Sequence, residues 1–155
     1  IVGSVLARMK HRAGEHRIEV DIPENMPLVP VDYVQMEQVF TNLLSNSVKY
    51  APEKTVIRVR SFVDGDEVHV TVSNQGPQVP DEHLERIFDK FFRFTASDRV
   101  TGTGLGLSIC KGIIEAHAGT IWVENIPDGL AFHFKIPLVW DGVPPPQMPA
   151  DMETE

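Results

Sequence analysis

The chain has 155 residues and a formal net charge of −8, and 42% of its residues are hydrophobic and 23% charged. These values are ordinary for a soluble globular protein, and the length suffices for one domain with a substantial core. The negative charge argues against nucleic acid as a partner, because nucleic-acid-binding proteins present a basic surface. The single cysteine, Cys110, excludes a disulfide framework and a cysteine-rich zinc site.

No apolar run in the sequence reaches the roughly 18 residues of a membrane span, and no signal peptide is visible. The first residue is Ile1 rather than a methionine. We therefore expect this chain to be a piece of a longer protein.

The first predicted elements are a short helix over residues 1–13 and a strand over residues 16–22, in which polar and apolar residues alternate. After a proline-punctuated connection, Asp32 is the expected N-cap of a helix that runs to about Tyr50 and is stopped by Pro52. Apolar residues at spacings of three and four mark the buried face of this helix: Met36, Val39, Phe40, Leu43, Leu44 and Val48.

Two valine-rich runs, residues 55–63 and 67–73, predict a hairpin joined at Asp64-Gly65-Asp66. We expect a turn over residues 74–77. Asp81 is then the expected N-cap of a short helix through Phe88, with its apolar residues Leu84, Ile87 and Phe88 pointing inward.

The remainder begins with an irregular segment over residues 91–104, rich in Thr, Ser, Asp and Gly. A helix over residues 104–118 follows, with Gly119 at its C′ position. The last predicted strands, 120–125 and 131–138, flank a Pro-Asp-Gly turn.

This order of elements predicts an α+β fold, a two-layer α/β sandwich in which helices cover one face of a mixed, mostly antiparallel sheet. One domain is expected over residues 1–138. The tail, 139–155, contains consecutive prolines and acidic residues and is expected to be disordered.

A polar stripe runs along the helix over residues 32–50, formed by Gln38, Asn42, Asn46 and Lys49. These four side chains point one way along about three turns. Because asparagine lowers helix propensity, something other than helix stability should keep two of them there. Carboxamide oxygens suit a hydrated hard cation and a lysine suits phosphate, so the stripe indicates a nucleotide with Mg²⁺.

A glycine-rich run, Gly102-Thr103-Gly104-Leu105-Gly106-Leu107, lies where the irregular segment becomes a helix. Taken alone, it is equally consistent with a flexible hinge and with a phosphate cradle at a helix N-terminus. It matches neither the dinucleotide fingerprint nor the Walker phosphate loop. The polar stripe and the nearby Arg93 favour the cradle.

Two further pairs of residues have both a structural and a functional interpretation. Arg93 can clamp a terminal phosphate, and Lys90 beside it is equally well explained as an exposed residue. Asn74 and Gly76 can simply end a strand, or Asn74 can bind the edge of a base while Gly76 allows close backbone approach.

The six histidines show no metal-ligand spacing and are expected at surface or structural positions: His11, His16, His69, His83, His117 and His133. His117 lies near the C-terminal end of the predicted helix over residues 104–118, where the helix dipole favours it.

Four motifs now stand in order along the chain: Asn42-x-x-x-Asn46-x-x-Lys49-Tyr50, Asn74-x-Gly76, Phe88-x-x-Phe91-x-Arg93, and the run from Gly102 to Leu107. Together they resemble the N, G1, F and G2 boxes of the catalytic ATP-binding domain of sensor histidine kinases. This domain has the Bergerat fold of the GHKL superfamily, shared with gyrase, Hsp90 and MutL. The resemblance covers about residues 1–138, and segments such as Ile121-Trp122-Val123-Glu124-Asn125 are most similar to the potassium-responsive KdpD kinases.

The resemblance implies a role for each motif. Asn46 with Asn42 would coordinate Mg²⁺ on the phosphates of ATP, Lys49 would contact phosphate, and Tyr50 would pack near the adenine or ribose. Asn74 would face the adenine amino group, with Gly76 beside it. Residues 94–101 would form the ATP lid, and Arg93, with Lys90 nearby, would reach the γ-phosphate. The remaining nucleotide contacts would come from the glycine run: Gly102, Thr103, Gly104, Leu105, Gly106 and Leu107.

The sequence departs from the family pattern at three informative positions. Asn74 replaces the usual aspartate, which predicts ATP binding weaker by about 1–2 kcal/mol, the difference between a charged and a neutral hydrogen bond. Gln78 replaces a glycine, so the chain there must avoid positive φ or carry strain. Gln38 stands where hydrolytic relatives have a glutamate base, so phosphoryl transfer to an imidazole is favoured over hydrolysis.

The leading interpretation is therefore a histidine kinase domain whose phosphoacceptor lies on a dimerisation domain N-terminal to Ile1, with a response regulator as further partner. A degenerate nucleotide-binding module is the alternative, and a hydrolytic or serine-directed relative is the third. The fragment is expected to be monomeric and cytoplasmic, and its parent a homodimer anchored in the bacterial inner membrane.

Overall fold

The computed structural model describes residues 3, 5, 16–24, 31–89 and 106–138. Of the predicted N-terminal helix, only Gly3 and Val5 belong to the described residues, and both are helical. The predicted irregular segment over 91–104 and the tail over 139–155 lie outside them.

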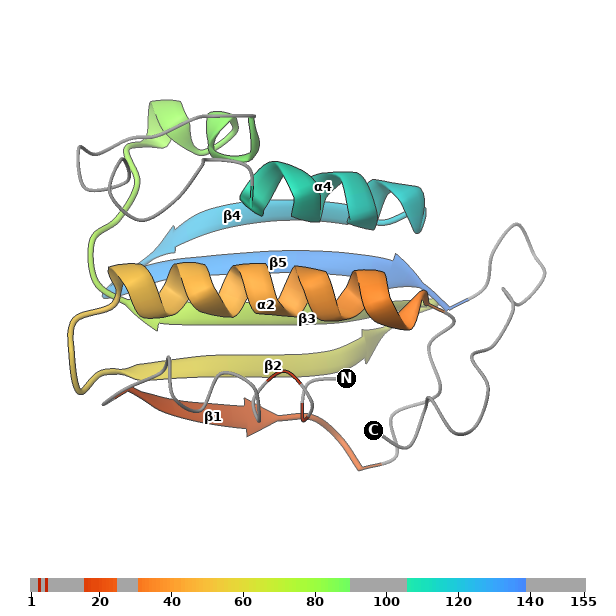
Figure 1. Ribbon diagram of the computed structural model, residues 1–155, viewed down its shortest axis with the longest axis horizontal. Helices are drawn as coiled ribbons and strands as arrows, with labels where there is room; N and C mark the ends of the chain where they lie inside the picture. The colour runs from red at the N-terminus through yellow and green to blue at the C-terminus, as the bar shows by residue number, and fades with distance from the viewer. Residues whose placement is uncertain (1–2, 4, 6–15, 25–30, 90–105, 139–155) are drawn as a thin grey trace.

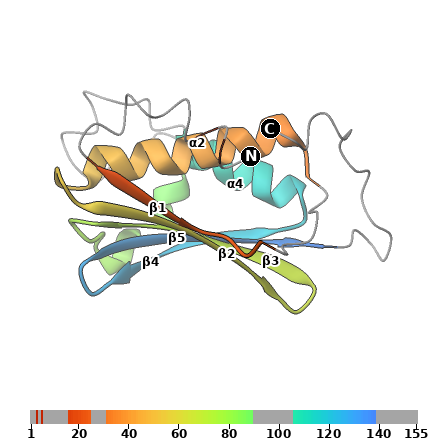
Figure 2. The ribbon, with the colours of Figure 1, turned by 90° about the horizontal axis from the view of Figure 1, so that it is seen from below.

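The described elements form two layers: a five-stranded sheet, and on one face of it the helices α2 (Tyr33–Tyr50) and α4 (Gly106–Ala116) (Figure 1). Figure 2 shows the opposite face of the sheet turned away from both helices. The strand order is β1-β2-β3-β5-β4. The strands are β1 (Arg17–Asp21), β2 (Val56–Asp64), β3 (Glu67–Gln75), β4 (Thr120–Ile126) and β5 (Gly129–Pro137).

β1 and β2 run parallel, and every other pair of neighbouring strands is antiparallel. The predicted α+β sandwich with a mixed, mostly antiparallel sheet is therefore confirmed. Neither α2 nor α4, the long helices of the described part, is apolar enough over sufficient length to cross a membrane.

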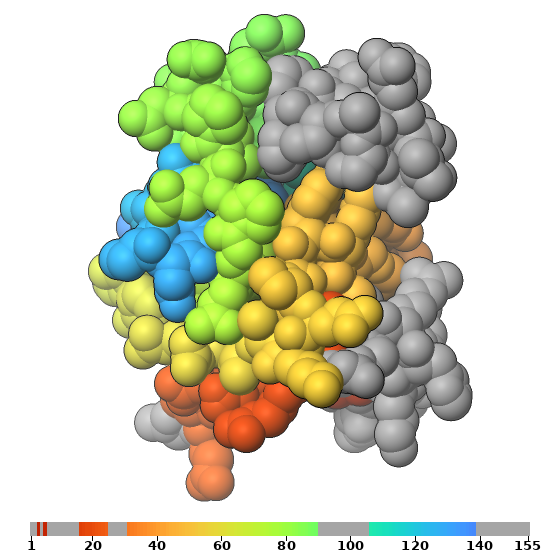
Figure 3. Space-filling view, turned by 90° about the vertical axis from the view of Figure 1, so that its left-hand side faces the viewer, coloured from red at the N-terminus to blue at the C-terminus, as the bar shows by residue number. Residues whose placement is uncertain are grey.

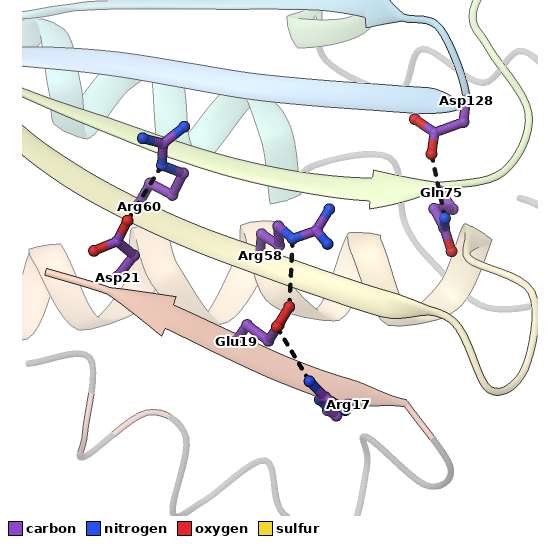
Figure 4. Close-up of polar contacts among 7 residues, drawn as sticks. All are labelled: Arg17, Glu19, Asp21, Arg58, Arg60, Gln75 and Asp128. Atoms are coloured by element: carbon purple, nitrogen blue, oxygen red, sulfur yellow. Dashed lines mark hydrogen bonds and ion pairs between the residues drawn. The ribbon is translucent and has the colours of Figure 1, made fainter.

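Opposite charges line the outer face where β1 meets β2 (Figure 4). Arg58 Nε lies 3.4 Å from Glu19 Oε1, and Arg60 Nε lies 3.6 Å from Asp21 Oδ2, in both cases between residues paired in register. These pairs are exposed and add little stability. They do favour this register, because a slip of one residue would separate the oppositely charged side chains and turn Ile18 away from the core.

The helix α2 begins as predicted, because Asp32 Oδ1 accepts a hydrogen bond of 2.9 Å from the backbone N–H of Gln35. It ends at Tyr50, two residues before Pro52. Its buried side chains include the predicted apolar stripe, and Val48 packs against the same core. On the sheet, alternate residues of each strand face α2 and α4, and Phe132 and Phe134 of β5 are among the largest fully buried side chains.

Two of the predicted turns are shifted in the structure. Asp64 pairs with Glu67, so the hairpin loop is Gly65-Asp66, and Gly65 has a φ of 66°. β3 continues through Gln75, so Asn74 belongs to a strand rather than to the predicted turn. In both cases cross-strand hydrogen bonding extends the strand into residues with turn propensity.

The predicted helix through Phe88 is instead two short 3₁₀ turns, η1 (Asp81–His83) and η2 (Arg86–Phe88). Asp81 as N-cap is wrong: Pro80 holds that position without a side-chain bond, and Asp81 Oδ1 lies 3.3 Å from Asn125 Nδ2 of β4. The inward placement of Ile87 and Phe88 is confirmed, and Leu84 packs against the core. Phe88 anchors this segment by an edge contact with Phe132.

α4 ends at Ala116, two residues before the predicted end, and its C′ position differs by one residue from the prediction. Ala118, not Gly119, has the left-handed conformation, with a φ of 60°. The N–H of Ala118 bonds to Glu115 O at 3.0 Å and the N–H of Gly119 bonds to Ile114 O at 2.9 Å, which is a Schellman motif with Ala118 at C′. Gly119 is required for another reason, because a Cβ there would collide with the carbonyl oxygen of Lys135.

His117 joins the two helices. Its Nδ1 lies 2.8 Å from Ile113 O and its Nε2 lies 3.0 Å from the backbone N of Asp32, the N-cap of α2. A backbone N–H needs a lone pair as acceptor, so His117 is neutral with its proton on Nδ1. The prediction of a structural histidine is confirmed, but its role is a hydrogen-bonded bridge rather than a cation at the helix dipole.

We expect the substitution Ala118→Gly to raise the free energy of unfolding by about 1 kcal/mol, because glycine adopts positive φ without the strain of a Cβ. Chemical denaturation with an unchanged m-value measures this. The matched substitution Gly119→Ala should lower stability by about 1–3 kcal/mol through overpacking against Lys135. A loss of stability in Ala118→Gly would contradict the assignment of the C′ position.

The substitution His117→Ala should lower the free energy of unfolding by about 2–3 kcal/mol, because it leaves the Asp32 N–H and the Ile113 carbonyl without their side-chain partner. His16 provides a comparison outside the helix bridge: its Nε2 lies 3.0 Å from Ala51 O, and loss of that hydrogen bond in His16→Ala should cost about 1 kcal/mol. Equal losses in the two variants would argue against the helix bridge.

Candidate functional site

The polar stripe of α2 connects the helix to α4. Gln38 Nε2 donates to Asn42 Oδ1 at 2.9 Å, and Asn42 Nδ2 donates to the carbonyl oxygen of Gly106 at 3.1 Å. Asn46 lies one turn further along and is half-buried, whereas Lys49 is exposed with its Nζ 5.0 Å from the centroid of the Tyr50 ring. Asn42 thus fixes the start of the described part of α4 beside the stripe.

The first turn of α4 lies beside the polar stripe of α2 and is a possible binding site for an anion. Free N–H groups and the helix dipole give a helix N-terminus a partial positive charge. A Cβ on Gly106 would lie 3.8 Å from Asn42 Cγ, an ordinary contact, so packing against Asn42 does not require a glycine here. Leu107 packs against the hydrophobic core. The other predicted contacts lie outside the described residues: Lys90, Arg93, Gly102, Thr103, Gly104 and Leu105.

Cys110 occupies the interface between the two helices. It is fully buried, and its Sγ lies 3.7 Å from the carbonyl oxygen of Val39. Burial raises the pKa of Cys110 to about 12, although a hydrogen bond with Asn42 acts in the opposite direction. The thiol is therefore unreactive at neutral pH and serves as a packing neighbour of Asn42.

Asn74 is a polar residue in an apolar register. It lies at the end of β3, follows the buried positions Val70 and Val72, and is only 4% exposed. Its Nδ2 donates to the carbonyl oxygen of Gln75 at 2.9 Å. The buried carboxamide therefore lies in the layer between the sheet and the helices, as expected for a group that binds a ligand there.

The end of β3 is held from two sides. Gly76 has a φ of 132°, and a Cβ there would lie 3.1 Å from both the carbonyl oxygen of Tyr50 and Pro52 Cδ, so the chain itself requires glycine. On the other side, the backbone carbonyl oxygen of Asp128 in the β4–β5 turn accepts from the Gly76 N–H at 3.0 Å. Its carboxylate oxygen Oδ2 accepts from Gln75 Nε2 at 3.2 Å (Figure 4).

Gln78 avoids the strain that a residue in place of glycine could carry. Among the described non-glycine residues, only Lys54 and Ala118 have positive φ. The side chain of Gln78 instead donates to the carbonyl oxygen of Ile126 at 2.5 Å. Gln78 therefore secures this segment to the end of β4.

Ser47 was not selected from the sequence. It is fully buried on α2, and its Oγ has no hydrogen-bond partner in the described part of the chain. The sequence does indicate that Ser47 is buried, because its position continues the helical spacing of the apolar residues Phe40 and Leu43. A buried hydroxyl without a partner, in the same helix–sheet layer as Asn74, adds a second polar group that a ligand could satisfy.

Figure 3 shows the end of the molecule at which these features meet. The C-terminal half of α2 lies beside the segment that follows β3, and a recess opens between them. The carboxamides of Asn42 and Asn46 are the groups in this region that suit Mg²⁺, which prefers oxygen ligands and retains several waters. Among the described residues, no group of three or more His, Cys, Asp or Glu side chains is arranged to hold a metal.

Comparison with known proteins identifies the family. The sequence profile of the histidine kinase-, DNA gyrase B- and HSP90-like ATPases matches residues 31–139. The adaptive-response sensory kinase SasA of Gloeothece citriformis is 42% identical over 124 residues, which are 79% of this chain and 32% of SasA. The phytochrome-like protein Cph1 of Synechocystis is 39% identical over 140 residues, 89% of this chain and 19% of Cph1.

Solved structures agree with this result. The catalytic domain of the histidine kinase ThkA superposes with a TM-score of 0.77 at 36% identity and covers 88% of this chain and 89% of its own. The mycobacterial sensor histidine kinase MprB has a TM-score of 0.78 at 27% identity and covers 92% of this chain and 93% of its own.

The chain spans about a third of the length of the SasA proteins that it matches. Its fold agrees with that of the catalytic domain of ThkA. The chain belongs to the family of histidine kinase-, DNA gyrase B- and HSP90-like ATPases, as an ATP-binding catalytic domain of the sensor histidine kinase type.

Proposed function

We propose that this domain binds ATP with Mg²⁺ and transfers the γ-phosphoryl group to a histidine side chain on a separate dimerisation domain. The observation that carries the proposal is the bond between Asn42 and Gly106, which sets the carboxamide stripe of α2 beside the first turn of α4. This arrangement brings together ligands for a hydrated cation and a helix N-terminus for phosphate.

The proposed ligands divide by chemistry. Asn46 is the principal Mg²⁺ ligand, since Asn42 already uses its amide to bind Gly106 and accepts from Gln38. Lys49, Arg93 and Lys90 neutralise phosphate charge, and backbone N–H groups of the glycine run bind the phosphate oxygens: Gly102, Thr103, Gly104, Leu105, Gly106 and Leu107. Tyr50, Asn74 and Gly76 line the adenine end, where Ser47 supplies a further hydroxyl.

Phosphoryl transfer is proposed instead of hydrolysis. Gln38, whose amide donates to Asn42, cannot accept a proton from water as a glutamate would. A neutral imidazole needs no such base, so positioning and charge stabilisation by the protein carry the reaction.

Two solved structures of relatives support the proposal that the nucleotide is ATP and that the partner is a response regulator. A solved structure of full-length ShkA, 27% identical to this chain, contains AMPPNP, and ThkA has been solved in complex with the response regulator protein TrrA. We infer that the parent of this chain likewise uses ATP and passes its phosphoryl group to a response regulator.

The finer predictions from the sequence remain part of this proposal. They are a KdpD-like, potassium-responsive parent, a homodimer that carries the phosphoacceptor helix, and anchoring in the inner membrane with this domain in the cytoplasm. The alternative, a degenerate nucleotide-binding module, is favoured by two departures from the family pattern, the neutral, buried Asn74 and Gln78.

The first test is Mg²⁺-dependent binding of a non-hydrolysable ATP analogue by calorimetry. Asn46→Ala should weaken binding in the presence of Mg²⁺ by about 10- to 100-fold, as expected for loss of one charge-assisted interaction of about 1.5–3 kcal/mol. Without Mg²⁺ the variant and the wild type should bind almost equally. Gln35→Ala, which changes an exposed side chain of the same helix, is the control and should bind as the wild type does.

A second measurement separates a kinase from a binding module. The parent chain supplied with γ-labelled ATP should accumulate acid-labile phosphohistidine faster than it releases phosphate. Analogue binding without labelling would favour the module, and rapid multiple-turnover release of phosphate would contradict the role given to Gln38.

The substitution Asn74→Asp should strengthen ATP binding by about 5- to 30-fold, because a carboxylate accepts the adenine amino hydrogen bond more strongly by about 1–2 kcal/mol. The same change should destabilise the unliganded domain, since it places a carboxylate at a buried position. Calorimetry and denaturation together check both signs. Unchanged affinity in a folded variant would remove Asn74 from the adenine site.

A further inference from the structure

A cluster of rings lies on the sheet face opposite α2 and α4, away from the proposed ATP site. Two histidines form its centre, His69 on β3 and His133 on β5, and their nitrogens Nε2 and Nδ1 are 3.0 Å apart. Phe62 stacks on His69 with ring centroids 4.8 Å apart, and Trp122 stacks on His133 at 5.1 Å with an interplanar angle of 10°. The aromatic neighbours hold both imidazoles with their edges facing each other.

The protonation pattern of His133 follows from its contacts. Its Nε2 lies 2.6 Å from the carboxylate oxygen Oε1 of Glu124, so this nitrogen carries the proton. Its Nδ1 then holds a lone pair and accepts from His69 Nε2 and from Thr71 Oγ1, which lies 3.1 Å away. A carboxylate that fixes the far nitrogen of an imidazole is the usual companion of a metal-bound histidine.

We propose that His69 Nε2 and His133 Nδ1 together bind a borderline divalent metal ion of the Zn²⁺ type on this outer face of the sheet. The metal replaces the hydrogen that the two nitrogens share, and His69 changes tautomer: the proton leaves Nε2 and Nδ1 takes one up from solvent, so the ring stays neutral and no net proton is released. Zn–N bonds of about 2.0–2.1 Å at a tetrahedral angle separate two nitrogens by about 3.3 Å. The nitrogens therefore need to part by only a few tenths of an ångström. Because they lie almost on the line between the ring centroids, which are 5.2 Å apart, each ring must also tilt so that its lone pair points at the metal.

The charges around the pair act in both directions. The carboxylates of Glu124 and Asp64 favour a cation there, whereas the ammonium of Lys135, which Asp64 binds at 3.1 Å, opposes it. Burial, His133 and Lys135 lower the pKa of His69, against the opposing effect of Asp64 and Glu124, which favours the neutral imidazole that metals bind. Imidazole ligands select Zn²⁺ or Cu²⁺ over Mg²⁺.

The site is open. No third His, Cys, Asp or Glu side chain of the described ranges completes a metal-binding group, so the Thr71 hydroxyl and water fill the remaining positions. We therefore expect one weakly bound ion. Its place on the uncovered face leaves the nucleotide site unaffected (Figure 2).

The test is a titration of the full chain with zinc chloride, followed by the imidazole NMR signals of all histidines. We expect the signals of His69 and His133 to shift together and to saturate near one equivalent, and magnesium chloride to have no such effect. Shifts confined to other histidines, or none at micromolar to submillimolar Zn²⁺, would overturn the proposal.

Two variants complete the test by calorimetry. His69→Phe keeps a ring between Phe62 and Trp122 but removes the nitrogen, and it should abolish this binding. His16→Gln, a control outside the cluster, should bind Zn²⁺ as the wild type does. If His69→Phe binds Zn²⁺ undiminished, the proposal is wrong, and if this variant does not fold, the NMR titration of the wild type decides.

Discussion

Two polar bridges between α2 and α4 are the constraint on which the rest of the site depends. At one end Asn42 binds the carbonyl oxygen of Gly106, and at the other His117 accepts from the N-cap residue Asp32. Between them Cys110 packs against Val39. Because both ends of α4 are tied, its first turn cannot slide along α2. The partial positive charge of that turn is thereby kept beside the carboxamides of Asn42 and Asn46, where a phosphate and its cation would need both.

Most of the fold could be predicted from the sequence because its elements have strong local periodicity. α2 combines a 3.6-residue apolar period with a capping aspartate, and β3 alternates cleanly between buried and half-buried residues. The errors concern residues whose state depends on distant partners. Asp81 bonds to Asn125 instead of capping a helix, and Ala118 takes positive φ because Gly119 must lie against Lys135. No window of sequence contains those partners.

The candidate site likewise contains residues that could be predicted from local spacing and residues whose environment depends on distant parts of the chain. Its stripe on α2 follows from helical spacing alone, whereas the burial of Asn74 and the unpartnered hydroxyl of Ser47 require the packed helix–sheet layer. The pair of His69 and His133 is the clearest example of the limit, since 64 residues separate two nitrogens that lie 3.0 Å apart. Spacing along the chain identifies metal ligands only when they share one element or one hairpin.

The glycine of the Asn-x-Gly motif shows that a motif can report on packing as well as on a ligand. Gly76 lies against the backbone of Tyr50 and Pro52, and Gly129 lies so close to the carbonyl oxygen of Asn74 that no side chain fits between them. The packing of the unliganded domain therefore already requires glycine at both positions. They bring the C-terminus of α2, the end of β3 and the β4–β5 turn together, and this packing buries the carboxamide of Asn74. At that buried point a neutral amide favours the stability of the domain more than a carboxylate would. In the adenine site that we propose, a carboxylate would bind the base more strongly, so folding and affinity would make opposite demands on this position.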